Sequence, residues 1–145
     1  MENNQVWTEK YRPKEWDGLI CDFKEKFIRL LKEPKQMQHI LLFSQKPGTG
    51  KTTIAKIIIN QLKADNLQLN ASDERKMEVI REKIKTFVKS MSSNPGVPRI
   101  VFLDECDGML KASQEALRSL MEEYTDNAKF ILTCNNIDKI IEPIQ

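Results

Sequence analysis

Cysteine and long apolar runs are both scarce in this 145-residue sequence. Its three cysteines, Cys21, Cys106 and Cys134, are an odd number, widely spaced and without a C-x-x-C pair. This pattern excludes a disulfide framework and a zinc site, and it fits a reducing compartment. No apolar run approaches the roughly eighteen residues of a transmembrane helix, so we expect none. The opening Met-Glu-Asn-Asn-Gln lacks the basic and apolar stretches of a secretory signal.

An excess of charge of either sign is also missing. Lys and Arg total 23 against 21 Asp and Glu, for a formal net charge of +2, so any nucleic-acid surface must be a local patch. The only histidine, His39, precedes an apolar run, and we expect it to be structural and not catalytic. What the sequence does have is 40% hydrophobic and 30% charged residues over the length of one domain, which excludes a disordered chain.

Short apolar runs alternate with amphipathic stretches along the chain. The runs predict strands at 40–43, 67–70, 100–103 and 130–133. The apolar spacing predicts helices at 23–32, 51–63, 74–91 and 112–124, and a last amphipathic piece at 137–144. This alternation indicates an α/β protein with a parallel sheet and helices on both faces. Ligands of such sheets bind at the carboxyl ends of the strands, so the residues after each run are the candidate site.

A phosphate-binding loop follows the first predicted strand. It reads Pro47-Gly48-Thr49-Gly50-Lys51-Thr52-Thr53, and a predicted helix begins within it, which is the context this motif requires. Backbone N–H groups would hold phosphates there, with Lys51 on the β- and γ-phosphates and the Thr52 hydroxyl on Mg²⁺. The G-x-x-x-x-G-K-[ST] pattern has Gly where this chain has Gln45, which predicts that Gln45 avoids a positive φ. A glycine-rich turn without a ligand is the alternative.

Carboxylates follow the third predicted strand. If Asp104 and Glu105 were buried without partners, they would cost folding free energy. They suit a site where Asp104 holds Mg²⁺ and Glu105 orients an attacking water. For Asp107 the alternative to a role in the site is a helix N-cap or a place in a solvated loop. After the fourth strand, Asn135 is placed to hydrogen-bond a γ-phosphate or the water, whereas turn chemistry of the Asn135-Asn136 pair is the alternative.

The helix predicted at 74–91 is basic. Between Arg75 and Lys89 it has six basic residues against two acidic ones. Arg81, Lys85 and Lys89 are four residues apart and share a face that could follow a phosphate backbone. The alternative is an ordinary solvated helix surface whose charges pair locally.

These motifs resemble those of the clamp loader ATPase subunits of the AAA+ class, which include the small subunits of replication factor C and the large subunit of T4-type phage clamp loaders. The likeness runs along the whole chain. It comprises W-x-E-K-Y-R-P at 7–13, the Walker A loop at 47–53, N-A-S-D-E-R at 70–75, the Walker B box D-E-x-D at 104–107, a sensor 1 Asn at 135 and K-I-I-E-P-I-Q at 139–145. Gln45-Lys46 replace the family's usual Gly-Pro and residues 18–23 lack its V-G-Q, so we expect a phage or other viral origin.

The resemblance implies a P-loop NTPase fold of the AAA+, RecA-like type. Residues 1–21 would be an arm contributing to an adenine pocket, through Tyr11, Arg12 and Pro13, and residues 22–145 would be the nucleotide-binding core. Glu105 would be the hydrolytic base, assisted by Lys51 and Asn135.

Further roles implied by the resemblance concern DNA and neighbouring subunits. Arg75 would link DNA contact to release of the catalytic Glu, and Arg81 and Lys85 would follow the duplex. Arg118 would lie on a helix that faces the nucleotide of the neighbouring subunit. ATP and Mg²⁺ would be the cofactors, and the partners would be other subunits of a ring, a sliding clamp and primer–template DNA, without a membrane.

The implied function is ATP-dependent loading of the sliding clamp onto primer–template DNA, in the host cytoplasm for a phage or the nucleus for a eukaryotic member. There are two alternatives. One is another AAA+ ATPase, such as a helicase loader, and the other is a nucleotide-binding module without turnover. In the family Ser-Arg-Cys follows the position of Gln145, so we expect the chain to stop before the arginine finger, the fifth strand and the lid. Residues 40–43 would then form an open sheet edge, and hydrolysis by this chain alone would be very slow.

Overall fold

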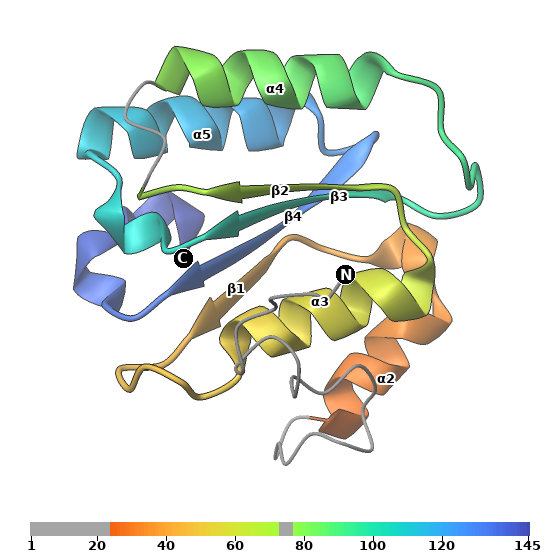
Figure 1. Cartoon of the computed structure of the whole chain (residues 1–145), viewed down its shortest axis with the longest axis horizontal. Helices are drawn as coiled ribbons and strands as arrows, with labels where there is room; N and C mark the ends of the chain where they lie inside the picture. The colour runs from red at the N-terminus through yellow and green to blue at the C-terminus, as the bar shows by residue number, and fades with distance from the viewer. Residues whose placement is uncertain (1–23, 73–76) are drawn as a thin grey trace, which may run out of the picture.

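Parallel strands form the centre of the fold (Figure 1). The computed structural model describes residues 24–72 and 77–145. The strands of this part are β1 (Ile40–Phe43), β2 (Asn66–Asn70), β3 (Arg99–Asp104) and β4 (Ala128–Cys134). They pair in the order β1-β4-β3-β2, every neighbouring pair parallel. The four predicted strands and the parallel sheet are thus confirmed, and β1 is an edge strand as expected.

Helices cover both faces of the sheet. They are α2 (Lys24–Lys32), α3 (Lys51–Leu62), α4 (Met77–Lys89) and α5 (Lys111–Glu123), with 3₁₀ turns η2 (Pro34–Gln36), η3 (Cys106–Gly108), η4 (Ile137–Lys139) and η5 (Glu142–Ile144). In Figure 1, α4 and α5 lie on one side of the sheet and α2 and α3 on the other. In the described residues, no helix has the length and apolar character needed to cross a membrane.

The strands are buried on both faces, as their continuous apolar runs predicted. Val101 and Leu103 of β3 point to the core shared with α4 and α5, and Ile100 and Phe102 point to the core shared with α3. Because successive side chains alternate between the faces, a slip of one residue would exchange the two cores. The register of the sheet is therefore fixed, and with it the relative positions of the strand ends.

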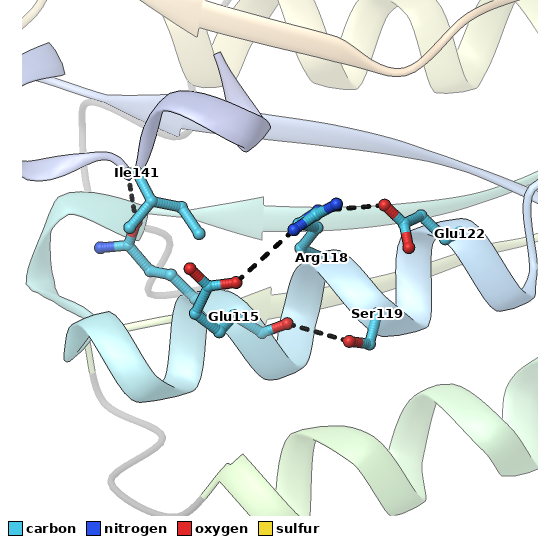
Figure 2. A network of polar contacts seen from close by, with 6 residues as sticks. Glu115, Arg118, Ser119, Glu122 and Ile141 are labelled. Carbon is cyan, nitrogen blue, oxygen red and sulfur yellow. Dashed lines mark hydrogen bonds and ion pairs between the residues drawn. The ribbon is translucent and has the colours of Figure 1, made fainter.

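The segment after β4, predicted as a last amphipathic piece at 137–144, is not a continuous helix. It forms the two 3₁₀ turns η4 and η5, separated by Ile140 and Ile141. Pro143 has no N–H to donate to a helix. The Ile141 N–H donates instead to Gln114 Oε1 at 2.9 Å, and the Lys139 carbonyl accepts from Gln114 Nε2 at 2.8 Å. Figure 2 shows Ile141 held beside α5 in this way.

Gln114 is the polar centre of this junction. It is 1% exposed, and its amide also donates to the Met109 carbonyl at 3.2 Å. We predict that Gln114→Leu lowers the free energy of unfolding by about 2–4 kcal/mol, because it leaves several backbone groups without partners. Urea denaturation measures this. The matched change Gln61→Leu, at an exposed position of α3, should change stability by at most about 0.5 kcal/mol. An equal effect of the two changes would contradict a structural role of the junction.

His39 joins β1 to β4, in agreement with the structural role expected for it. Its Nδ1 accepts from the Phe130 N–H at 3.1 Å, and its ring packs edge-on against the Phe130 ring. Burial, and then the nearby Lys129 cation, lower the pKa of His39. The neutral ring that accepts this hydrogen bond is therefore the favoured form.

Candidate nucleotide-binding site

The loop between β1 and α3 has the conformation of a phosphate loop. Gly48 and Gly50 have φ values of +72° and +89°, which a residue with a side chain adopts at a cost. Among the described residues other than glycine, only Lys63 and Glu105 have a positive φ. Gln45 therefore avoids a positive φ, as predicted, and no glycine is needed there. No side chain caps α3 at Gly50, so the first N–H groups of this helix are available to an anion.

Lys51 is folded over this loop. Its Nζ lies 3.4 Å from each of three oxygens, the carbonyls of Ser44 and Lys46 and the hydroxyl of Thr49. The ammonium is thus held between the two ends of the loop, where it would meet phosphate oxygens bound by the loop amides.

Thr52 and Asp104 lie together, as predicted for a pair that binds Mg²⁺. The Thr52 hydroxyl donates to Asp104 Oδ2 at 3.0 Å, and a second hydroxyl, that of Thr133, donates to Asp104 Oδ1. No group of three or more His, Cys, Asp or Glu suited to a metal occurs in the described residues. One carboxylate and one hydroxyl fit Mg²⁺, which keeps several waters and takes its other ligands from phosphates.

Glu105 points toward the end of β2. Its Oε2 accepts from the Ser72 hydroxyl at 2.9 Å and from Asn70 Nδ2 at 3.3 Å. The Glu105 backbone has a left-handed φ of +57°, and its N–H donates to the Thr133 hydroxyl at 3.0 Å. The side chain predicted to orient water is therefore in the site, but it is held by neighbours from another strand end.

Asp107 anchors the segment that contains Asn135. Its Oδ2 accepts from the N–H groups of Asn135 and Asn136 at 3.3 and 3.2 Å. Asp107 is therefore not the N-cap of α5, where Leu110 stands. Asn136 has turn chemistry, since its Oδ1 accepts from the Asp138 N–H at 3.1 Å. Asn135 stays half-buried at the strand end, with its N–H on the Asp107 carboxylate of η3.

Three polar residues of the site were not predicted to take part. Asn70 and Ser72 bind Glu105, and Thr133 joins Asp104 to the backbone of Glu105. One signal was present in the sequence: Thr133 is a polar residue inside an apolar run, and it is 1% exposed in the structure. Asn70 is the partner of Asp104 in the β2–β3 register, which only the folded sheet reveals.

The two described cysteines flank the site but are not nucleophiles. Cys106 follows Glu105 and Cys134 precedes Asn135, and both thiols are buried. Burial is the main cause that raises the pKa of each, and nearby carboxylates raise them further. A protonated, enclosed thiol is a poor nucleophile.

Two cavities lie at opposite ends of the sheet. One of about 270 Å³ is lined by Thr52, Asn70 and Asp104 at the carboxyl end. The other, of about 570 Å³, is lined by Val97, Arg99 and Lys129 at the amino end. Arg99 is occupied there, since its guanidinium donates to the carbonyls of Phe87 and Val88 at the end of α4. The smaller cavity has the convergent polar groups and the position that ligands take in parallel sheets.

Other predicted site residues lie away from this cluster or outside the described residues. Tyr11, Arg12, Pro13 and Arg75 are outside them. Arg81 is exposed and Lys85 half-buried on α4. Arg118 lies on α5 between two exposed carboxylates, with its Nε 3.0 Å from Glu122 Oε1 and its Nη1 3.9 Å from Glu115 Oε2 (Figure 2).

Comparison with known proteins agrees with this geometry. Residues 41–145 match the family described as "ATPase family associated with various cellular activities (AAA)". The chain is 46% identical to a replication factor C small subunit of Sulfolobus acidocaldarius over 152 residues, 100% of this chain and 46% of that protein. It is 47% identical to that of Saccharolobus solfataricus over 150 residues, 97% of this chain and 44% of that protein.

Solved structures give the same fold. The "RuvB Holliday junction branch migration motor" of Thermotoga maritima matches with a TM-score of 0.72 and 26% identity, over 92% of this chain and 45% of that one. The chain thus spans less than half the length of these relatives. The family model covers residues 41–145, more than half of the chain, and the chain therefore belongs to the AAA ATPases.

Proposed function

We propose that this chain is the nucleotide-binding core of a clamp loader subunit, which binds ATP with Mg²⁺ and hydrolyses it while loading a sliding clamp onto primer–template DNA. The observation that carries the proposal is the convergence of the phosphate loop with Asp104 and Glu105 at one end of the sheet. The 46% identity to a replication factor C small subunit supports clamp loading as the process that this ATP hydrolysis serves.

The chain's own groups would bind the triphosphate in two parts. The loop amides and Lys51 would take the phosphate oxygens, because Lys51 Nζ already lies over the loop and no side chain caps the first N–H groups of α3. Thr52 and Asp104 would hold Mg²⁺, which neutralises phosphate charge when bound. Tyr11, Arg12 and Pro13 of the arm would enclose the adenine.

Glu105 would orient the attacking water, with Asn135 beside it. In the structure its carboxylate is held by Ser72 and Asn70, so it must leave these donors before it can accept a hydrogen bond from a water at the phosphate. Arg75, three residues after Ser72, would contact DNA and free the carboxylate. Turnover would then depend on DNA.

Basic residues of α4 would contact the duplex. Arg81 and Lys85 present cations on one side of the helix, and phosphate contacts of this kind give affinity without sequence preference. Arg118 would face the nucleotide of the adjacent subunit in the ring, on the outer surface of α5.

A branch-migration motor is the second candidate function, favoured by the likeness to the RuvB structure.

Steady-state ATP turnover of the full loader, with its partner subunits, distinguishes clamp loading from branch migration. We predict that primed DNA plus clamp raises turnover at least about tenfold. The double change Arg81→Ala, Lys85→Ala should remove most of this stimulation and leave the basal rate unchanged, and Lys111→Ala, at an exposed position of α5, should leave both unchanged. Stimulation by a four-way junction and not by primed DNA and clamp would contradict clamp loading.

A further inference from the structure

We propose that Lys46 is a second phosphate-binding cation of this loop and that it acts on the terminal phosphate of a nucleoside triphosphate. The inference deepens the proposed nucleotide site and depends on it. It starts from a departure from the usual loop sequence, since Lys46 stands where the resemblance has Pro.

The backbone of Lys46 lies beside the Lys51 ammonium. Its carbonyl lies 3.4 Å from Lys51 Nζ and accepts from the Thr49 hydroxyl at 3.3 Å. Its N–H donates to the Ser44 hydroxyl at 3.3 Å. Because the lysine of a phosphate loop lies on the β- and γ-phosphates, Lys46 stands at that end of the nucleotide and not at the α-phosphate.

The side chain of Lys46 is available for such a contact. It is exposed, and no ion pair or hydrogen bond of its ammonium occurs within the described residues. Thr52 and Thr133 donate to Asp104, and Ser72 and Asn70 donate to Glu105, so neither carboxylate is a partner of Lys46. A lysine side chain spans about 6 Å from Cα to Nζ, and the Lys46 carbonyl lies 3.4 Å from Lys51 Nζ, so the Lys46 ammonium can reach a phosphate next to Lys51.

The contact would distinguish triphosphate from diphosphate. The γ-phosphate is the terminal group of a triphosphate and carries more charge there than the β-phosphate. A diphosphate has no γ-phosphate. An exposed charge-assisted contact of this kind changes affinity by about fivefold to tenfold and weakens as salt increases.

The test is titration of Mg·ATP and Mg·ADP into the 145-residue chain. Lys46→Ala should weaken ATP binding about fivefold to tenfold and ADP binding less than about twofold, and Lys46→Arg should restore most of the difference. Lys35→Ala, at an exposed position of η2 before β1, is the matched control. Equal weakening of ATP and ADP by Lys46→Ala, or no weakening of either, would overturn the proposal.

Lys51→Ala separates this inference from the proposed site. If Lys51→Ala abolishes ATP binding and Lys46→Ala has no effect, the nucleotide site stands and the role of Lys46 is wrong. If Lys51→Ala leaves ATP binding unchanged, the proposed site itself is wrong, and the role of Lys46 with it.

Discussion

Replacing Glu105 with Gln should reduce ATP turnover by the proposed clamp loader about 10²–10³-fold while nucleotide binding is kept. Gln has nearly the same shape, and its amide oxygen can still accept the hydrogen bond that the Ser72 hydroxyl donates to Glu105 at 2.9 Å. It has no negative charge with which to polarise a water or take its proton. The loss should therefore appear in the rate of hydrolysis and not in the dissociation constant of ATP.

Single-turnover hydrolysis and ATP titration of the same preparation measure these two quantities. Glu142→Gln, an isosteric change at an exposed position of η5, is the control and should leave both unchanged. A Glu105→Gln variant that kept more than about a tenth of the turnover would show that another group orients the water.

Lys51→Ala should weaken ATP binding at least about 100-fold without unfolding the chain. The ammonium is held at the loop by contacts with Ser44, Lys46 and Thr49, all near 3.4 Å and therefore weak. Its loss costs the fold little. The same group would form strong, charge-assisted hydrogen bonds with phosphate oxygens, which the variant cannot replace.

Thermal unfolding with and without Mg·ATP reports both effects together. Nucleotide that binds only the folded state raises the midpoint of wild-type unfolding. Lys51→Ala should have a nearly unchanged midpoint without nucleotide and no rise with it, whereas Lys35→Ala should behave as wild type. A rise of equal size in Lys51→Ala would mean that ATP binds somewhere other than the phosphate loop.

Local features of the fold and site could be predicted from the sequence, because short segments determine them. The apolar run at β1, the glycines at 48 and 50 and the G-K-T that follows specify a strand, a turn and a helix start within about a dozen residues. The conformation of Gln45 also followed from sterics alone, and the structure agrees.

The contacts between strand ends could not be predicted in this way. The Ser72 and Asn70 contacts with Glu105 span 33 and 35 residues of sequence. They exist because the β2–β3 register places Asn70 opposite Asp104. The Gln114 junction likewise joins α5 to residues 25 and 27 positions away, and the amphipathic piece at 137–144 forms two turns beside it.

Amide NMR of the 145-residue chain, titrated with Mg·ATP, locates the bound nucleotide without assuming any role for a side chain. We expect the largest shifts at loop residues 44–52, with Glu105 and Asn135 among the next largest. Small shifts are expected at residues 95–99 and 126–129, around the 570 Å³ cavity at the amino end of the sheet. Shifts concentrated in that cavity, or none at saturating nucleotide, would contradict a nucleotide site at the carboxyl ends of the strands.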